Sequence, residues 1–252
     1  MAVVIKYGGN AMTSEPLRQA VAKDISQLAL RGFAPVVVHG GGPFIKQALD
    51  QARLEHSFIR GLRVTSAKSL PIVEQTLTML NKKLSQEIGK SVGLSGRDNS
   101  ILVAKKISDG LGYVGEISQV NSQFIFELLN LQITPVISPL ASDNNLGILN
   151  VNADEVAGAV AASLQSSVIF LTDVAGVLDD FNNPNSLLKE ITKAQILERI
   201  DNGKIAGGMI PKVEAALKAL KQGAEYAVIA DGREPKILAK VIAAEAGTKI
   251  IS

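Results

Sequence analysis

The chain has 252 residues, enough for one large α/β domain with a buried core, and its formal net charge is only +2. The absence of cysteine excludes disulfides and thiolate metal sites, and the two histidines lack metal-ligand spacing. No basic stripe indicates nucleic acid, the N-terminus has no signal-peptide pattern, and no apolar run reaches the roughly 20 residues of a membrane span. We therefore expect a cytoplasmic protein without a metal site of its own and with neither nucleic acid nor membrane as a partner.

Short apolar runs alternate with longer segments of helical periodicity. The predicted strands are 2–5, 35–38, 133–137, 168–172 and 226–230, and the predicted helices are 16–31, 44–53, 67–88, 122–131, 154–164, 211–222 and 235–245. The strand-like runs are continuously apolar, as in strands buried on both faces of a parallel sheet. The alternation predicts a three-layer α/β fold, and the glycine-rich stretch 91–120 predicts β-hairpins at the sheet edge.

Two glycine-rich loops follow predicted strands in the N-terminal half. In K-Y-G-G-N, residues 6–10, Lys6 ends a strand at the edge where open α/β sheets bind ligands, although an ordinary turn would explain this loop equally well. In H-G-G-G-P, residues 39–43, three glycines exceed what a turn needs, and free amides at the start of the next helix can hold phosphate. His39 is interpreted as a structural hydrogen-bonding residue rather than a base. Because neither G-x-x-x-x-G-K-[ST] nor G-x-G-x-x-G occurs, the usual nucleotide fingerprints are absent.

Two further motifs carry polar residues that suit substrate binding. In G-L-R-V-T, residues 61–65, Arg63 could bind a carboxylate through two hydrogen bonds, and a plain surface arginine is the alternative. In L-N-V-N-A-D-E, residues 149–155, Asn150 and Asn152 face the same side of an extended segment. Asp154 then opens a helix, either as a simple N-terminal acid or as part of a polar site.

The last two motifs lie in the C-terminal half. In L-T-D-V-A-G-V-L, residues 171–178, Asp173 ends an apolar strand at the ligand edge. In G-G-M-I-P-K-V, residues 207–213, Pro211 marks a helix start, so Lys212 lies in the first turn. A cation there opposes the helix dipole at a cost of a few tenths to about 1 kcal/mol, which a bound phosphate would reverse. A lone exposed lysine is the alternative.

The six motifs, in this order and spacing, resemble those of the amino acid kinase family over nearly the whole chain. The resemblance implies a single domain, 1–252, built as an αβα sandwich with a mainly parallel open sheet of about eight strands. It also implies an N-terminal lobe, about 1–150, for the acceptor substrate and dimerisation, and a C-terminal lobe, about 151–252, for ATP.

The resemblance also implies roles for individual residues. Lys6 and Lys212 match the two lysines that stabilise the transferring phosphoryl group, and Asp154 matches the aspartate that orients both. Gly8 and Gly9 match phosphate-binding glycines. The residues matching the acceptor site are Gly41, Gly42, Arg63 and Asn150. Those matching the nucleotide loops are Asp173, Val174, Gly176, Val177, Leu178, Lys204, Ile205, Ala206 and Gly208.

The implied activity is ATP-dependent phosphorylation of a side-chain carboxylate, with Mg²⁺ carried by the nucleotide and N-acetyl-L-glutamate as the acceptor, a step of arginine biosynthesis. A carboxylate is already ionised at neutral pH and needs no general base, which agrees with the shortage of histidine. Two alternatives stay open: a kinase acting on aminoadipate attached to a carrier protein, and a non-catalytic amino-acid sensor that binds partners.

Arginine-inhibited members of the family carry a helix before the first strand. Here Lys6 comes too early for such a helix, so we expect a homodimer without strong inhibition by arginine. A PII-type regulator is a conceivable partner, but no motif in the sequence indicates one.

Overall fold

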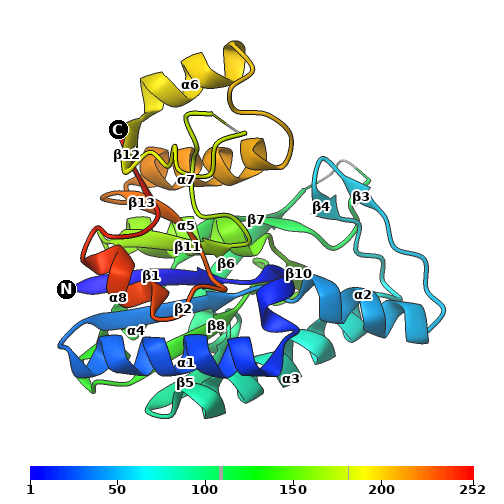
Figure 1. Cartoon of the computed structure of the whole chain (residues 1–252). Helices are drawn as coiled ribbons and strands as arrows, with labels where there is room; N and C mark the ends of the chain where they lie inside the picture. The colour runs from blue at the N-terminus through cyan, green and yellow to red at the C-terminus, as the bar shows by residue number, and fades with distance from the viewer. Residues whose placement is uncertain (108–109, 181) are drawn as a thin grey trace.

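A mostly parallel sheet forms the centre of the protein (Figure 1). The computed structural model describes residues 1–107, 110–180 and 182–252, except for the side chains of Asn10 and Ala11. Within these residues, eight strands pair in the order β12-β14-β13-β11-β1-β2-β8-β5. β14 pairs with β13 antiparallel, whereas the other pairs of this sheet are parallel. The predicted αβα sandwich with a mainly parallel sheet is confirmed.

The strands have two to six residues each, and the α-helices have six to nineteen. The strands are β1 (Ala2–Tyr7), β2 (Ala34–His39), β3 (Phe58–Ile59), β4 (Leu62–Arg63), β5 (Ser91–Ser95), β6 (Leu102–Lys106), β7 (Gly115–Val120), β8 (Thr134–Ser138), β9 (Leu140–Ser142), β10 (Ile148–Asn150), β11 (Ser167–Thr172), β12 (Glu190–Thr192), β13 (Ala227–Asp231) and β14 (Thr248–Ile251). The α-helices are α1 (Glu15–Leu30), α2 (Gly42–Gln51), α3 (Leu70–Ile88), α4 (Ser122–Asn130), α5 (Ala153–Ser163), α6 (Lys193–Asp201), α7 (Ile210–Gln222) and α8 (Ile237–Ile242), with 3₁₀ turns η1 (Gly9–Met12), η2 (Asp98–Ser100) and η3 (Gly207–Met209). Over the described ranges, none of these helices has the length and apolar character that crossing a membrane would take.

Helices cover both faces of the central sheet because its strands are apolar on both sides. In β1, Val3 and Ile5 belong to one buried cluster with residues of α1, α3 and α8, whereas Val4 belongs to the opposite cluster with α4, α5 and α7. This split follows from the period of two along a strand. The apolar runs in the sequence therefore reflect burial on two faces.

The expectation of β-hairpins at the sheet edge over 91–120 is partly wrong. β5 is a parallel edge strand of the central sheet, next to β8. Only β6 and β7 form a hairpin, and they belong to a separate four-stranded sheet, β10-β9-β6-β7. Residues 108–109 of this stretch lie outside the described residues.

Several elements were not predicted. They are the β3–β4 pair, β9, β10, β12, α6 and β14. The helix predicted over 235–245 is shorter, and its α-helical part is α8 (Ile237–Ile242). The missed strands have only two to four residues each, so their side chains give little periodic signal.

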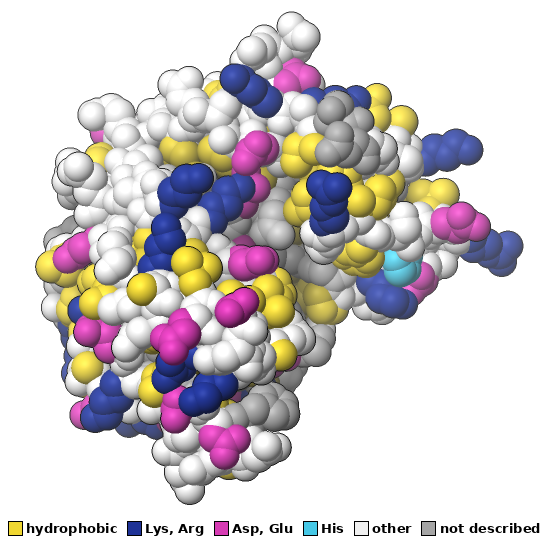
Figure 2. All heavy atoms as spheres, turned by 90° about the horizontal axis from the view of Figure 1, so that it is seen from above, with side chains coloured by type: hydrophobic (Ala, Val, Ile, Leu, Met, Phe, Trp, Pro, Cys, Tyr) yellow, Lys and Arg dark blue, Asp and Glu magenta, His cyan; other side chains and the backbone are white. Residues whose placement is uncertain are grey.

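The strand order places three loops at one edge of the sheet. β1 lies between β11 and β2, and the three strands are parallel, so their carboxyl ends meet at the same edge. Ligands of open α/β sheets bind outside the carboxyl ends of the strands. The binding crevice lies where the connections that follow two neighbouring strands run to opposite faces of the sheet. Seen from above, the molecule has a hollow bordered by side chains of both charge signs (Figure 2).

Candidate active site

Lys6 and Asp154 form an ion pair at the carboxyl end of β1. The Lys6 Nζ lies 2.9 Å from Asp154 Oδ1. Asn152 is the N-cap of α5, and its Oδ1 accepts hydrogen bonds from the backbone N–H groups of Asp154 and Glu155 at 2.7 and 3.4 Å. Because Asn152 caps the helix, the Asp154 carboxylate is available to hold the lysine.

Lys212 is held by a different carboxylate. It lies in the first turn of α7, as predicted, and its Nζ is 3.3 Å from both Asp173 Oδ1 and the Gly208 carbonyl oxygen. Burial raises the pKa of Asp173, but the hydrogen bond and charge of Lys212 outweigh it and the net shift is downward. The resemblance implied that Asp154 orients both lysines, whereas in this structure it pairs with Lys6, and Asp173 pairs with Lys212.

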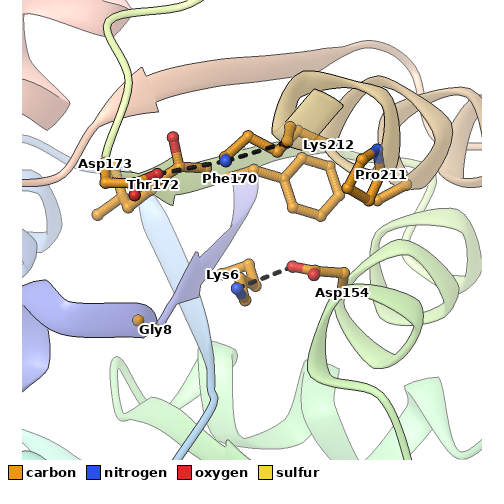
Figure 3. Close-up of a pocket in the computed structure, with 12 residues that line it drawn as sticks. Lys6, Gly8, Asp154, Phe170, Thr172, Asp173, Pro211 and Lys212 are labelled. Carbon is orange, nitrogen blue, oxygen red and sulfur yellow. Dashed lines mark hydrogen bonds and ion pairs between the residues drawn. The ribbon is translucent and has the colours of Figure 1, made fainter. Parts of the chain in front are cut away.

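The two ion pairs lie on opposite sides of one cavity of about 300 Å³ (Figure 3). The residues that line it come from both halves of the chain: Lys6, Gly8, Gly9, Asp154, Phe170, Leu171, Thr172, Asp173, Gly208, Pro211, Lys212 and Ala215. A Cβ atom on Gly8 would lie 3.1 Å from the Lys6 amine, and Gly9 has a φ of +74°, so both positions favour glycine. Two ammonium groups beside a glycine loop suit the phosphates of a nucleotide.

A second cavity, of about 260 Å³, adjoins the first. Its walls include the glycine loop after β2, with Gly41 and Gly42, and also Arg63 and Asn150. Lys6, Gly9 and Asp154 line both cavities. The structure thus brings the predicted acceptor residues into one cavity and makes the Lys6–Asp154 pair the boundary with the other.

Arg63 lines the second cavity and has one buried hydrogen-bond donor without a partner among the described residues. Its Nη2 donates to the Gly42 carbonyl at 3.2 Å, and its guanidinium stacks 4.7 Å from the centre of the Phe58 ring. The Nη1 is buried and finds no hydrogen-bond partner among the described residues. Burial also lowers the pKa of the guanidinium, with the Asp50 charge acting the other way. An anionic ligand would satisfy both the charge and the orphaned donor.

Asn150 is oriented by a buried threonine that the sequence analysis passed over. Its Nδ2 donates to Thr65 Oγ1 at 3.1 Å, and Thr65 is completely buried. Thr65 was within the G-L-R-V-T motif and could have been noticed there. Phe58, which supports Arg63, had no signal in the sequence, because it lies outside every motif.

The predicted nucleotide residues divide into two groups. Asp173 and Gly208 line the first cavity, whereas the other predicted residues do not. Val177 and Ile205 are buried in the hydrophobic core, at 1% and 2% exposure. The Val177 N–H donates to Thr248 Oγ1 at 2.8 Å, so this segment is held against β14. Any contact of these two residues with a nucleotide would have to involve their backbone.

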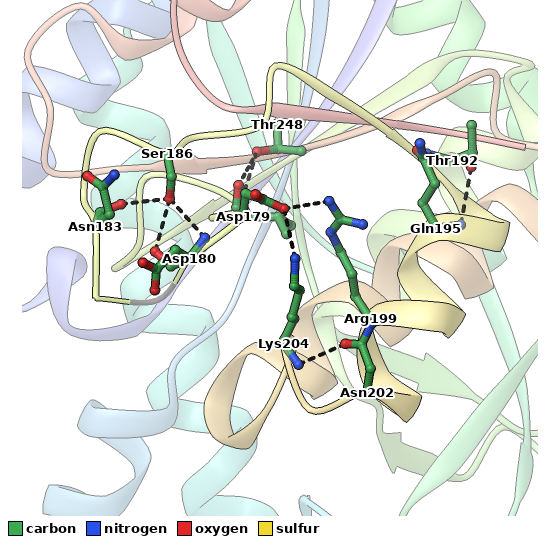
Figure 4. Close-up of polar contacts among 11 residues, drawn as sticks. Asp179, Asp180, Asn183, Ser186, Thr192, Gln195, Arg199, Asn202, Lys204 and Thr248 are labelled. Carbon is green, nitrogen blue, oxygen red and sulfur yellow. Dashed lines mark hydrogen bonds and ion pairs between the residues drawn. The ribbon is translucent and has the colours of Figure 1, made fainter.

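Asp179 joins the two predicted nucleotide segments (Figure 4). It directly follows the first segment, and its Oδ1 lies 2.6 Å from Arg199 Nη2 and 3.6 Å from Lys204 Nζ. Arg199 is in the last turn of α6, and its carbonyl accepts the Ile205 N–H at 2.8 Å. The carboxylate of the residue that follows the first segment therefore contacts Lys204 of the second.

Comparison with known proteins gives a consistent result over the whole chain. A model of the amino acid kinase family matches residues 1–231. The acetylglutamate kinase of Deinococcus radiodurans is 47% identical over 250 residues, covering 99% of this chain and 100% of that protein. Among solved structures, smu.665 from Streptococcus mutans is 31% identical with a TM-score of 0.77, covering 91% of this chain and 94% of that one. N-acetylglutamate synthase from Neisseria gonorrhoeae has a TM-score of 0.85 at 21% identity, covers 100% of this chain and 59% of that one, and shares the fold.

Proposed function

Because the chain belongs to the amino acid kinase family, we propose that it transfers the γ-phosphoryl group of ATP to the side-chain carboxylate of N-acetyl-L-glutamate. This reaction is a step of arginine biosynthesis. The observation that carries the proposal is the pair of adjoining cavities that share Lys6, Gly9 and Asp154. A phosphoryl group can pass between two substrates only where their sites meet.

The first cavity is the proposed nucleotide site, formed mainly by the C-terminal lobe, about 151–252. The amines of Lys6 and Lys212 and the amides of Gly8 and Gly9 would face the β- and γ-phosphates. Within the described residues, no group of three or more His, Cys, Asp and Glu side chains could hold a metal ion. Mg²⁺ would instead arrive with the nucleotide, near the Asp154 and Asp173 carboxylates, whose oxygens suit it, and it would neutralise phosphate charge.

The second cavity is the proposed acceptor site, formed by the N-terminal lobe, about 1–150, together with the segment that leads into α5. Arg63 would bind the acceptor's α-carboxylate through its guanidinium group, and Asn150 would bind the acetamido group. This arrangement directs the side-chain carboxylate of the acceptor toward Gly41, Gly42 and Lys6.

The reaction needs charge compensation more than it needs acid or base catalysis. An ionised carboxylate oxygen forms a bond to the γ-phosphorus, the bond to the β–γ bridging oxygen breaks, and ADP leaves. No proton moves at the nucleophile, since a glutamate-type carboxyl group has a reference pKa near 4.3. Lys6 and Lys212, placed on opposite sides of the cavity, offset the repulsion between the two anions.

The two alternatives have less support. Curated relatives that match nearly the full chain are acetylglutamate kinases, which does not favour a kinase of carrier-linked aminoadipate. Both lysines and Asp154 line one cavity, an arrangement that a non-catalytic sensor would not require.

A coupled assay of ADP release tests this function, with the product trapped as a hydroxamate to show the acyl phosphate. We expect turnover with N-acetyl-L-glutamate and little with glutamate, aspartate, carbamate or carrier-linked aminoadipate. Lys6→Ala and Lys212→Ala should each lower kcat by about 10²-fold or more, judging by the loss of single electrostatic donors elsewhere. Lys23→Ala, an exposed lysine on α1 outside both cavities, is the control and should keep full activity. Near-normal turnover in both site variants would refute the assignment.

The proposed assembly is a homodimer in the cytoplasm. The edge strand β5 of the central sheet and Met79, 67% exposed on the neighbouring helix α3, offer an open face for a second copy. Light scattering after size-exclusion chromatography tests this state. A monomeric mass at micromolar concentration would contradict it.

A further inference from the structure

A buried polar chain lies directly behind the glycine loop after β2. His39, the last residue of β2, is completely buried, and its Nδ1 lies 2.9 Å from the Gly40 carbonyl oxygen. Asn81, 2% exposed on α3, places its Nδ2 3.0 Å from His39 Nε2 and 2.8 Å from the Val136 carbonyl oxygen. Neither side chain lines either cavity, so the mechanism above does not use them.

These contacts allow one protonation state of the imidazole. The Val136 carbonyl can only accept, which identifies the Asn81 atom as the amide nitrogen. That nitrogen donates its second hydrogen to His39 Nε2, which must therefore be unprotonated. The proton resides on Nδ1 and is donated to the Gly40 carbonyl. The imidazole is neutral, in agreement with a pKa that burial lowers to about 4.

The direction of the Gly40 carbonyl sets the direction of the next amide. In a planar trans peptide the C=O and the following N–H point opposite ways. Since the Gly40 oxygen turns inward to His39, the Gly41 N–H turns outward, on the side of the acceptor cavity that Gly41 lines. The hydrogen bonds of the described residues give this N–H no acceptor, whereas the Gly40 N–H is used by the Tyr7 carbonyl at 2.8 Å.

We propose that His39 and Asn81 are positioning residues for phosphoryl transfer: the chain Asn81–His39–Gly40 aims the Gly41 N–H at the phosphoryl group in transit. The inference rests on the proposed function, since it needs a phosphoryl group at the boundary of the two cavities. It assigns α3 a task beyond packing, because Asn81 fixes the tautomer from the middle of that helix.

The kinetic test compares His39→Leu and Asn81→Leu with a control variant that loosens the same helix. Each site variant should lower kcat by roughly 10- to 100-fold, as expected for a misdirected anion-binding amide, and leave the dissociation constant of ATP within about twofold. Leu84→Ala removes a buried side chain one turn further along α3 and should keep the wild-type kcat. A site variant with wild-type kcat, or a kcat loss in Leu84→Ala as large as in the site variants, would overturn the proposal.

A second measurement needs no substitution at the network. Long-range ¹H–¹⁵N spectra of the wild-type enzyme identify the tautomer of each histidine, and His56→Gln assigns the two sets of signals. The proposal requires His39 to be the neutral Nδ1–H tautomer, and a neutral Nε2–H tautomer or an imidazolium at pH 7.5 would overturn it. If the wild-type enzyme forms no acyl phosphate with any acceptor, the proposed function itself fails, and that result is seen without any variant.

Discussion

Acidification should destabilise the protein through His39, by an amount that can be worked out. The pKa of His39 is lowered from 6.5 to about 4, because burial excludes the charged form, and the hydrogen bond to Gly40 opposes this only in part. The unfolded state therefore binds more protons below pH 6.5. This contribution to the free energy of unfolding is fully present above about pH 6.5 and is lost as the pH falls toward 4.

Each pKa unit of difference between the folded and unfolded states corresponds to 1.36 kcal/mol, so the full loss in the free energy of unfolding is about 3 kcal/mol. About 2 kcal/mol of this loss occurs between pH 7 and pH 5. Urea unfolding at these two pH values measures it, with His39→Gln as the test variant. The carboxylates titrate in both proteins and cancel in the comparison, so the wild type should lose about 2 kcal/mol more than His39→Gln. His56→Gln retains His39 and should show the wild-type loss. Equal losses in the wild type and in His39→Gln would refute the reasoning.

Three other substitutions test separate parts of the structure. Arg18→Ala should lower the free energy of unfolding by about 3–5 kcal/mol, because the Glu87 carboxylate, 2.8 Å from Arg18 Nε, loses its partner. Urea unfolding measures this difference, and a loss below about 1 kcal/mol would contradict the prediction. Asp179→Ala should raise the KM for ATP by about fivefold, equivalent to about 1 kcal/mol, and leave the acceptor KM unchanged. Equal changes in both constants would show that Asp179 does not act through the nucleotide loops alone. Arg63→Lys should raise the acceptor KM by about tenfold or more without changing the ATP KM, because a lysine cannot donate in the same planar geometry. Steady-state kinetics with each substrate varied in turn measures both constants, and an unchanged acceptor KM would contradict the prediction.

The central architecture could be predicted because it follows from local patterns. Continuous apolar runs mark β1, β2, β8, β11 and β13, whose residues are buried on both faces of the sheet. The two site lysines, at a strand end and in a first helical turn, are assigned through the resemblance to the amino acid kinase family, since their positions alone leave other interpretations open. Both amines do line the same cavity.

Other features depend on contacts that no local pattern contains. α6 is a polar helix in which only Ile196 is buried, so its apolar signal is weak, although the Thr192–Gln195 capping box could have indicated its start. The pairing of Lys212 with Asp173 joins residues that lie in separate motifs. The His39–Asn81 contact spans 42 positions and depends on how α3 packs against the sheet.

A crystal structure with Mg²⁺, a non-hydrolysable ATP analogue and N-acetyl-L-glutamate tests the central claim most directly. The account predicts the γ-phosphate at the boundary of the two cavities, with the amines of Lys6 and Lys212 within about 2.7–3.2 Å of its oxygens and the acceptor carboxylate in line with the phosphorus. A nucleotide bound with its γ-phosphate out of reach of either amine would contradict it.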